Sequence, residues 1–315
     1  MTLSRIRGDW APIIPKLVES PAPVHDPAFD FTCVTNRNLI LDICAVNASK
    51  PVNFDLARAL VHELNVRVHE GLARFFPNPA EFMHILATTN AVVSGSWLLA
   101  FLLSPESWQP KDLDVFVPRG PPGQVIEHYL QLMGYVCTRS FDGISAMYIG
   151  DENAMQRVSY VNTWTNDALG VSVDIAISVT DFAVDVIRGF HSTIVMNMLS
   201  ASHIIIMFPD LTLRNVGYAV PSMTPAVRAK YTDRGFDLVS SNDHLDGPCG
   251  LACPSLVRSA FHPKTTVIAP IDSRFLTLRP AVTPLAKYWS APVSCVNPKC
   301  INNVFVKMGG KPVED

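Results

Sequence analysis

The sequence is poor in charged residues. Only 17% of its 315 residues are Asp, Glu, Lys or Arg, whereas 48% are hydrophobic, and the formal net charge is -3. A chain with this much apolar material can bury a core large enough to offset its conformational entropy, which excludes a disordered protein. Because the 25 basic residues do not outnumber the 28 acidic ones, the chain has no overall positive field that would attract a nucleic-acid backbone.

Charge is absent altogether from two long segments, residues 82–105 and 189–209. Each is long enough to cross a bilayer, but each carries several Ser, Thr, Asn or His residues and lacks a basic cluster beside it. We therefore predict helices or strands of a soluble core, with no membrane contact.

The N-terminal stretch MTLSRIRGDWAPIIPK has no apolar run of signal-peptide length. We expect an intracellular protein, cytoplasmic or nuclear.

Proline divides the chain into three parts. Residues 1–52, 53–215 and 216–315 contain six, eight and eleven of the 25 prolines. Apolar residues recur every four positions from Leu56 to Leu72, which predicts an amphipathic helix. Helices are also predicted for AEFMHILATT, WLLAFLL and GQVIEHYLQLMGY, strands for DLDVFV, AMYIG, QRVSYVNTW and VSVDIAISV, and a short strand or turn for AVVSGS. The fold class is α/β (α+β), with a mixed sheet flanked by helices. We expect an N-terminal extension packed on a core at 53–215, and a Cys- and Pro-rich C-terminal region.

The strand DLDVFV carries two acids on one face. Side chains alternate along a strand, so Asp112 and Asp114 point to one side while Leu113, Val115 and Val117 point to the other. In VSVDIAISV, Asp174 is placed in the same way. Adjacent carboxylates repel one another unless a cation lies between them, and hard oxygen ligands suit Mg²⁺ or Mn²⁺. If the strands are neighbours, the three acids can serve a two-metal phosphoryl or nucleotidyl transfer.

A Gly-Ser pair precedes the first two acids. Gly95 and Ser96 stand before the helix-like WLLAFLL. Glycine allows a phosphate to approach the backbone closely, and the free N–H groups at a helix start form an anion site. A phosphate-binding turn beside metal-binding acids is the outline of a nucleotide site.

The stretches VVSGSWLLAF, KDLDVFV and SVDIAI together resemble the signature of the nucleotidyltransferase superfamily related to DNA polymerase beta. The resemblance spans residues 80–180. It implies an enzyme that moves a nucleoside monophosphate from an NTP to an acceptor hydroxyl and releases pyrophosphate. By the same resemblance, Gly95 and Ser96 hold the triphosphate, Asp112 and Asp114 bind both metals, and Asp174 binds the catalytic metal and helps to deprotonate the acceptor. The acceptor stays open between an RNA 3′ end, a small molecule and a protein. The whole chain is also similar to an uncharacterised group of fungal, mostly basidiomycete, proteins.

Two alternatives stand beside this prediction. Fifteen residues separate Ser96 from Asp112, more than is usual in the superfamily, so a catalytically silent protein of the same fold, acting as a binding or scaffold module, remains possible. A D-x-D pair also occurs in phosphatases of the haloacid-dehalogenase type. These place Thr or Val two residues after the second acid and a buried strand before the first. Phe116 and the polar QPK stand at those positions here.

Four of the seven cysteines form two close pairs in the last quarter of the chain. CGLAC contains Cys249 and Cys253, and CVNPKC contains Cys295 and Cys300. Two such pairs are typical of a structural Zn²⁺ site, in which His244 or His262 could replace one thiolate; the alternative is free thiols. Cys33, Cys44 and Cys137 are predicted to be core residues.

Other polar residues are candidates for nucleotide binding. FHSTIVMNML follows the third acid and contains Thr193, which could contact the nucleotide; the alternative is a partly buried helix. RAKYTDRGF contains Arg228, Lys230 and Arg234 beside aromatic residues. These cations, together with Arg258, could contact a triphosphate or a nucleic-acid acceptor, or could lie on a solvated helix face.

Overall fold

The computed structural model describes residues 31–49, 52–105, 107–142, 157–240, 249–250, 253–257, 265–276 and 295–303. Four sequence predictions lie wholly or partly outside these residues: the packing of residues 1–30 of the N-terminal extension, the strand AMYIG, the nucleotide-binding role of Arg258, and the histidines 244 and 262 as alternative zinc ligands.

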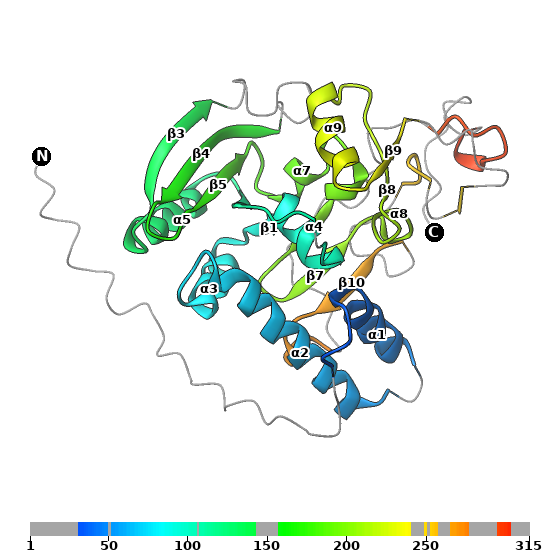
Figure 1. Ribbon diagram of the computed structural model, residues 1–315, viewed down its shortest axis with the longest axis horizontal. Helices are drawn as coiled ribbons and strands as arrows, with labels where there is room; N and C mark the ends of the chain where they lie inside the picture. The colour runs from blue at the N-terminus through cyan, green and yellow to red at the C-terminus, as the bar shows by residue number, and fades with distance from the viewer. Residues whose placement is uncertain are drawn as a thin grey trace, which may run out of the picture. The chain divides into compact units, whose positions relative to one another are not determined.

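The described chain forms a mixed α/β fold around an eight-stranded sheet (Figure 1). The strand order is β10-β7-β6-β1-β2-β5-β4-β3. The strands are β1 (Val92–Ser94), β2 (Asp112–Val117), β3 (Val136–Asp142), β4 (Val158–Asn166), β5 (Val171–Ser178), β6 (Asn197–Leu199), β7 (His203–Ile206) and β10 (Val267–Pro270). Among these described strands, β2 and β5 alone pair in parallel; every other pair is antiparallel. A second, two-stranded parallel sheet is formed by β8 (Val216–Tyr218) and β9 (Asp237–Val239).

Helices cover both faces of the large sheet. They are α1 (Asn36–Ala48), α2 (Phe54–Ala73), α3 (Pro79–Thr89), α4 (Gly95–Leu103), α5 (Pro121–Leu132), α7 (Val184–Ile187), α8 (Pro209–Thr212) and α9 (Pro225–Asp233), with short 3-10 turns η2 (Thr193–Val195) and η4 (Ser273–Phe275). Side chains cap the N-termini of α2 and α3. The Asn53 side chain accepts a hydrogen bond from the N–H of Leu56, and Asn78, followed by Pro79, caps α3 in the same way.

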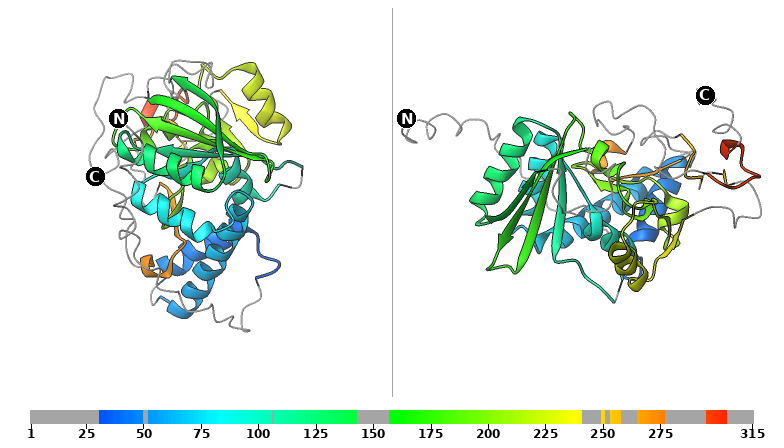
Figure 2. Two further views of the ribbon diagram at one scale, coloured as in Figure 1. Left: turned by 90° about the vertical axis from the view of Figure 1, so that its left-hand side faces the viewer. Right: turned by 90° about the horizontal axis from the view of Figure 1, so that it is seen from above.

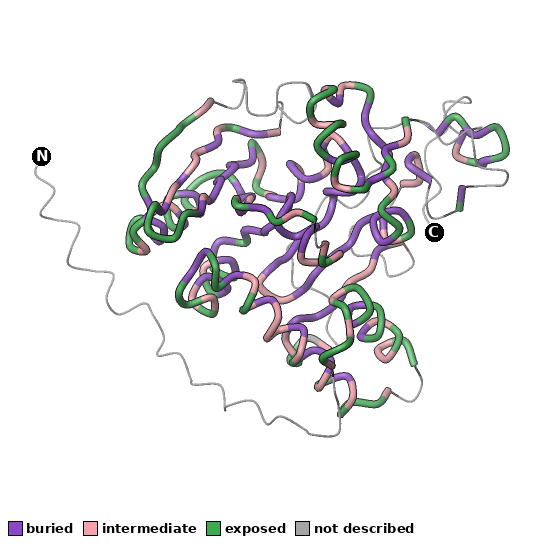
Figure 3. The backbone as a smooth tube through the Cα atoms, viewed as in Figure 1, coloured by how far each residue is buried: buried purple, intermediate pink, exposed green. Residues whose placement is uncertain are grey.

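Two apolar clusters lie on opposite faces of the sheet. One packs α1, α2, α3 and α5 against alternate residues of β2 and β5, among them Val115 and Ile175. The other packs α7, β8, β9 and α9 against the residues that point the other way, among them Phe116 and Ala176. Figure 2 shows the first set of helices from two further directions, and Figure 3 shows that the central strands are almost entirely buried. The face of the second cluster is the face to which the three acids point.

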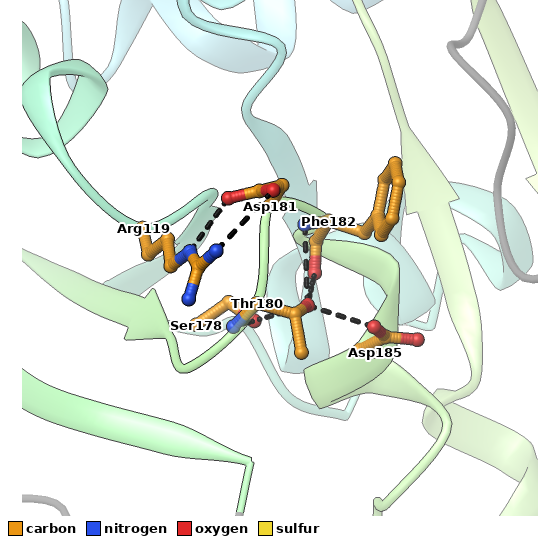
Figure 4. A network of polar contacts seen from close by, with 6 residues as sticks. All are labelled: Arg119, Ser178, Thr180, Asp181, Phe182 and Asp185. Atoms are coloured by element: carbon orange, nitrogen blue, oxygen red, sulfur yellow. Dashed lines mark hydrogen bonds and ion pairs between the residues drawn. The ribbon is translucent and has the colours of Figure 1, made fainter.

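A polar network fixes the turn that follows β5 (Figure 4). The Thr180 hydroxyl donates to the Asp185 carboxylate at 2.7 Å and lies 3.1 Å from the Ser178 hydroxyl. Arg119, just after β2, pairs with Asp181 at 2.6 Å, but both side chains are more than half exposed, so this ion pair contributes little stability. The network joins the C-terminal ends of β2 and β5, whereas Asp112 stands at the first position of β2.

Most elements predicted from periodicity are present, but one segment was assigned incorrectly and some elements were not predicted. The segment FHSTIVMNML is not a helix: it forms the turn η2 and strand β6. Strand β3 was not predicted; its exposed residues, such as Val136, belong to an edge strand without a continuous apolar face. Among the described helices, none is both long and apolar enough to pass through a bilayer. The two uncharged segments instead contribute β1, α4, β6 and β7 to the core.

Candidate active site and metal-ligand clusters

The parallel pairing of β2 with β5 brings the predicted acids together. Asp114 lies directly opposite Asp174 in the register, and Asp112 lies opposite Ser172. One carboxylate oxygen from each of Asp112, Asp114 and Asp174 lies within 4.8 Å of the others. We call these three residues the acid triad. Asp174 is 6% exposed, and the other two are half-buried.

The acid triad is electrostatically strained. Burial, followed by the charges of Asp112 and Asp174, raises the pKa of Asp114 to about 8, although Lys230 and a hydrogen bond from the Ser96 N–H oppose the shift. Burial also raises the pKa of Asp174, against a hydrogen bond from Thr163. Among the described residues, no group donates a hydrogen bond to the buried Oδ1 atom of Asp174. A divalent cation would relieve the repulsion and provide a partner for that oxygen.

Gly95 is required by the approach of Asp114. Its φ of +71° lies in the left-handed region, and a Cβ atom at this position would stand 1.9 Å from Oδ2 of Asp114. The turn thus delivers the N–H of Ser96 to the Asp114 carboxylate, at the start of α4. The predicted neighbourhood of the Gly-Ser turn and the acids is therefore present. In this structure, the Ser96 N–H faces a carboxylate.

A cationic and aromatic group lies beside the Ser96 hydroxyl. The Arg234 guanidinium donates to Ser96 Oγ at 3.0 Å and stacks over Trp108, 4.3 Å from the ring centroid. The Tyr231 hydroxyl lies 3.5 Å from the same Oγ atom. Within the described part of the chain, Arg234 has no acidic partner. Lys230 is exposed, and its charge acts on Asp114. A guanidinium held this way, with no carboxylate, suits an anionic ligand.

The structure separates the other candidates from this group. Arg228 donates to the carbonyl of Leu238 at 2.6 Å, so it fastens α9 to β9. Thr193 is fully buried, and its hydroxyl oxygen accepts the N–H of Tyr218 at 2.9 Å. Trp108, which no sequence pattern identified, lies in the long connection between α4 and β2. A lone aromatic residue in an irregular segment gives no periodic signal, so the stacking of Trp108 on the candidate Arg234 could not be inferred.

The four cysteines of the two C-terminal pairs also converge. Cys249, Cys253, Cys295 and Cys300 are all buried, and their sulfur atoms lie within 4.8 Å of one another. We call them the four-cysteine cluster, which is able to hold a metal ion.

Two of the three remaining cysteines were predicted incorrectly. Cys33 and Cys137 are exposed, whereas Cys44 is partly buried and packs against the first apolar cluster. A cysteine at the start of a helix or on an edge strand need not face the core.

The chain matches no protein-family model, no curated protein and no solved structure.

Proposed function

We propose that the protein is a metal-dependent nucleotidyltransferase, which moves a nucleoside monophosphate from an NTP to an acceptor hydroxyl. The observation that carries the proposal is the convergence of the acid triad beside the Gly95–Ser96 turn. The three acids come from β2 and β5, whose pairing is invisible in the linear sequence. A chance D-x-D pair would not be expected to meet a third buried acid from a separate strand.

The acid triad suits Mg²⁺ or Mn²⁺. All three ligands are hard carboxylate oxygens, and the buried Oδ1 of Asp174 lacks a partner among the described residues. When bound, the metal would supply positive charge at the reacting phosphate and lower the pKa of the acceptor hydroxyl. The acid triad would hold the ions, and their charge would keep Asp114 ionised at neutral pH.

In the reaction, the acceptor oxygen forms a bond to the α-phosphorus while the bond from that phosphorus to the β-phosphate bridging oxygen breaks. Pyrophosphate leaves with that oxygen. The acceptor proton passes to the carboxylate of Asp174, the buried acid of the triad.

Arg234 and Lys230 would bind the departing phosphates. Arg234 is oriented by Trp108 and already donates to Ser96, at the start of α4. The Ser96 hydroxyl, the guanidinium and the exposed Lys230 ammonium are donors suited to phosphate oxygens. Their position beside the acid triad supports the proposal that phosphate binds next to the metal.

Label transfer from an NTP tests this proposal. The full-length protein is incubated with Mg²⁺ or Mn²⁺, each α-labelled NTP, and a panel of RNA 3′ ends and hydroxylated small molecules. We expect label to move to an acceptor, and Asp112→Asn to abolish transfer. Asp237→Asn, a change of an exposed acid on β9, serves as the matched control. Metal-dependent NTP binding without transfer to any acceptor, including the protein itself, would support the silent binding module instead.

A further inference from the structure

The four-cysteine cluster lies apart from the two apolar clusters of the sheet. Of the described hydrophobic residues, only the partly buried Leu256 packs against it. Four thiols with so little apolar material around them do not form a core by themselves.

The sulfur positions match a tetrahedral metal centre. The Sγ atoms of Cys249 and Cys295 are 3.8 Å apart, and those of Cys253 and Cys300 are 3.6 Å apart. A tetrahedron with its centre about 2.3 Å from each sulfur, the usual zinc–thiolate distance, has edges of about 3.8 Å. A disulfide would require about 2.0 Å, so all four residues are free thiols here.

Backbone turns and hydrogen bonds orient the thiols. The N–H of Cys253 donates to the carbonyl of Gly250 at 3.2 Å, and the N–H of Cys300 donates to the carbonyl of Asn297 at 3.1 Å. These turns bring the two sulfurs of each pair to the same side. The Asn297 side chain donates to the sulfur of Cys249 at 3.4 Å, a contact that crosses from one pair to the other.

Two of the donors to these sulfurs, the side chains of Asn297 and Asn302, are not themselves among the four thiols. Nδ2 of Asn302 lies 3.8 Å from the sulfur of Cys300. Donors outside the ligand set that orient and tune the ligands are a regular feature of protein metal sites.

We propose that the four-cysteine cluster binds one structural Zn²⁺ ion, which joins residues 249–257 to residues 295–303. Thiolate ligands favour zinc over magnesium, and four protein ligands leave no open position for a substrate. The ion therefore acts on the fold and takes no direct part in the chemistry of the acid triad. The hydrogen bond from the Cys295 N–H to the Ser255 hydroxyl, 2.6 Å long, is a second link between the same segments.

In the sequence, the two cysteine pairs lie on either side of one strand of the large sheet. Strand β10 lies between the two cysteine pairs in sequence and forms an edge of the sheet, paired with β7. Zinc would therefore join the chain segments that precede and follow this edge strand.

Metal analysis of the full-length protein, purified under reducing conditions without chelator, tests the proposal. We expect about one zinc per chain. Replacement by Co²⁺ should give the absorption of a tetrahedral tetrathiolate centre. Cys253→Ser should lose the metal, whereas Cys137→Ser, which changes an exposed thiol outside the cluster, should retain it.

A measurement on the unaltered chain keeps the test valid if Cys253→Ser fails to fold. Chelation should abolish hydrogen-exchange protection in residues 249–257 and 295–303 while β2 and β5 stay protected, because these strands belong to a separate core. Absence of both zinc and cobalt binding in the reduced protein would overturn the proposal. So would the finding that the cluster thiols of the native protein are joined in disulfides.

Discussion

Replacement of Asp114 by Asn should stabilise the metal-free protein and remove its response to magnesium. The ionised carboxylate is destabilised by burial and by two neighbouring acids, so the folded protein holds the proton to a pKa of about 8, far above the ordinary value of 3.8. Asn removes the charge but keeps an oxygen that accepts the Ser96 N–H.

The direction and size of the effect follow from this shift. Because the folded state binds the proton more tightly than the unfolded state, the stability gained from protonation is complete below pH 4. It is lost as the pH rises toward 8. Each pKa unit corresponds to about 1.4 kcal/mol, and the carboxylate is only half-buried, so we expect a loss of about 2–4 kcal/mol across this range. Asp114→Asn should lack this part of the dependence of stability on pH.

Urea unfolding followed by circular dichroism, at several pH values between 4 and 8.5 and with or without Mg²⁺, measures the effect. Magnesium should stabilise the wild type and Asp237→Asn, whose altered side chain is exposed, but not Asp114→Asn. If Asp114→Asn is less stable than the wild type at pH 8 without metal, or is still stabilised by magnesium, the acid triad is not a strained metal site.

Three further substitutions test the surroundings of the acid triad. Gly95→Ala should abolish Mn²⁺ binding, measured by calorimetry, because the new methyl group displaces a triad carboxylate. Gly170→Ala is the control, since Gly170 has a similar φ of +64° but open space around it. It should lower the free energy of unfolding by only about 1–2 kcal/mol, through backbone strain, and should retain Mn²⁺ binding. Equal Mn²⁺ affinities in the two variants would contradict the geometry. Arg234→Gln should weaken NTP binding about 10- to 100-fold through the loss of charge-assisted hydrogen bonds, whereas Arg228→Gln should leave the Kd nearly unchanged. If Arg228→Gln weakens NTP binding more than Arg234→Gln does, Arg234 is not the phosphate-binding cation. Thr193→Val should lower the free energy of unfolding by about 1–3 kcal/mol without altering the Kd for NTP, since the Thr193 hydroxyl accepts a hydrogen bond from a buried backbone N–H. Weaker NTP binding at unchanged stability would instead support the predicted contact of Thr193 with the nucleotide.

The sequence predicted the local parts of the site better than their assembly. Alternation along β2 and β5 identified the face on which the three acids lie, and the apolar runs on either side of Gly95 predicted a strand and a helix. The parallel register that sets Asp114 opposite Asp174 depends on contacts between residues far apart in the chain. No local pattern encodes such a pairing.

The failures have a similar cause. The apolar run around Thr193 is short enough to suit either a helix or a strand, and pairing of β6 with β1 and β7 decides the outcome. Trp108 acquires its role only when α9 brings Arg234 over its ring. The spacing of the cysteine pairs was more informative, because two close pairs can converge once one turn forms in each.

The most direct test of the central claim is a crystal structure of the protein with Mn²⁺ and a non-hydrolysable NTP, with the ion located by its anomalous scattering. The account predicts an ion about 2.2 Å from carboxylate oxygens of Asp112, Asp114 and Asp174, with the triphosphate reaching Ser96 and Arg234. An acid triad without manganese at saturating concentration, or a triphosphate bound elsewhere on the protein, would contradict it.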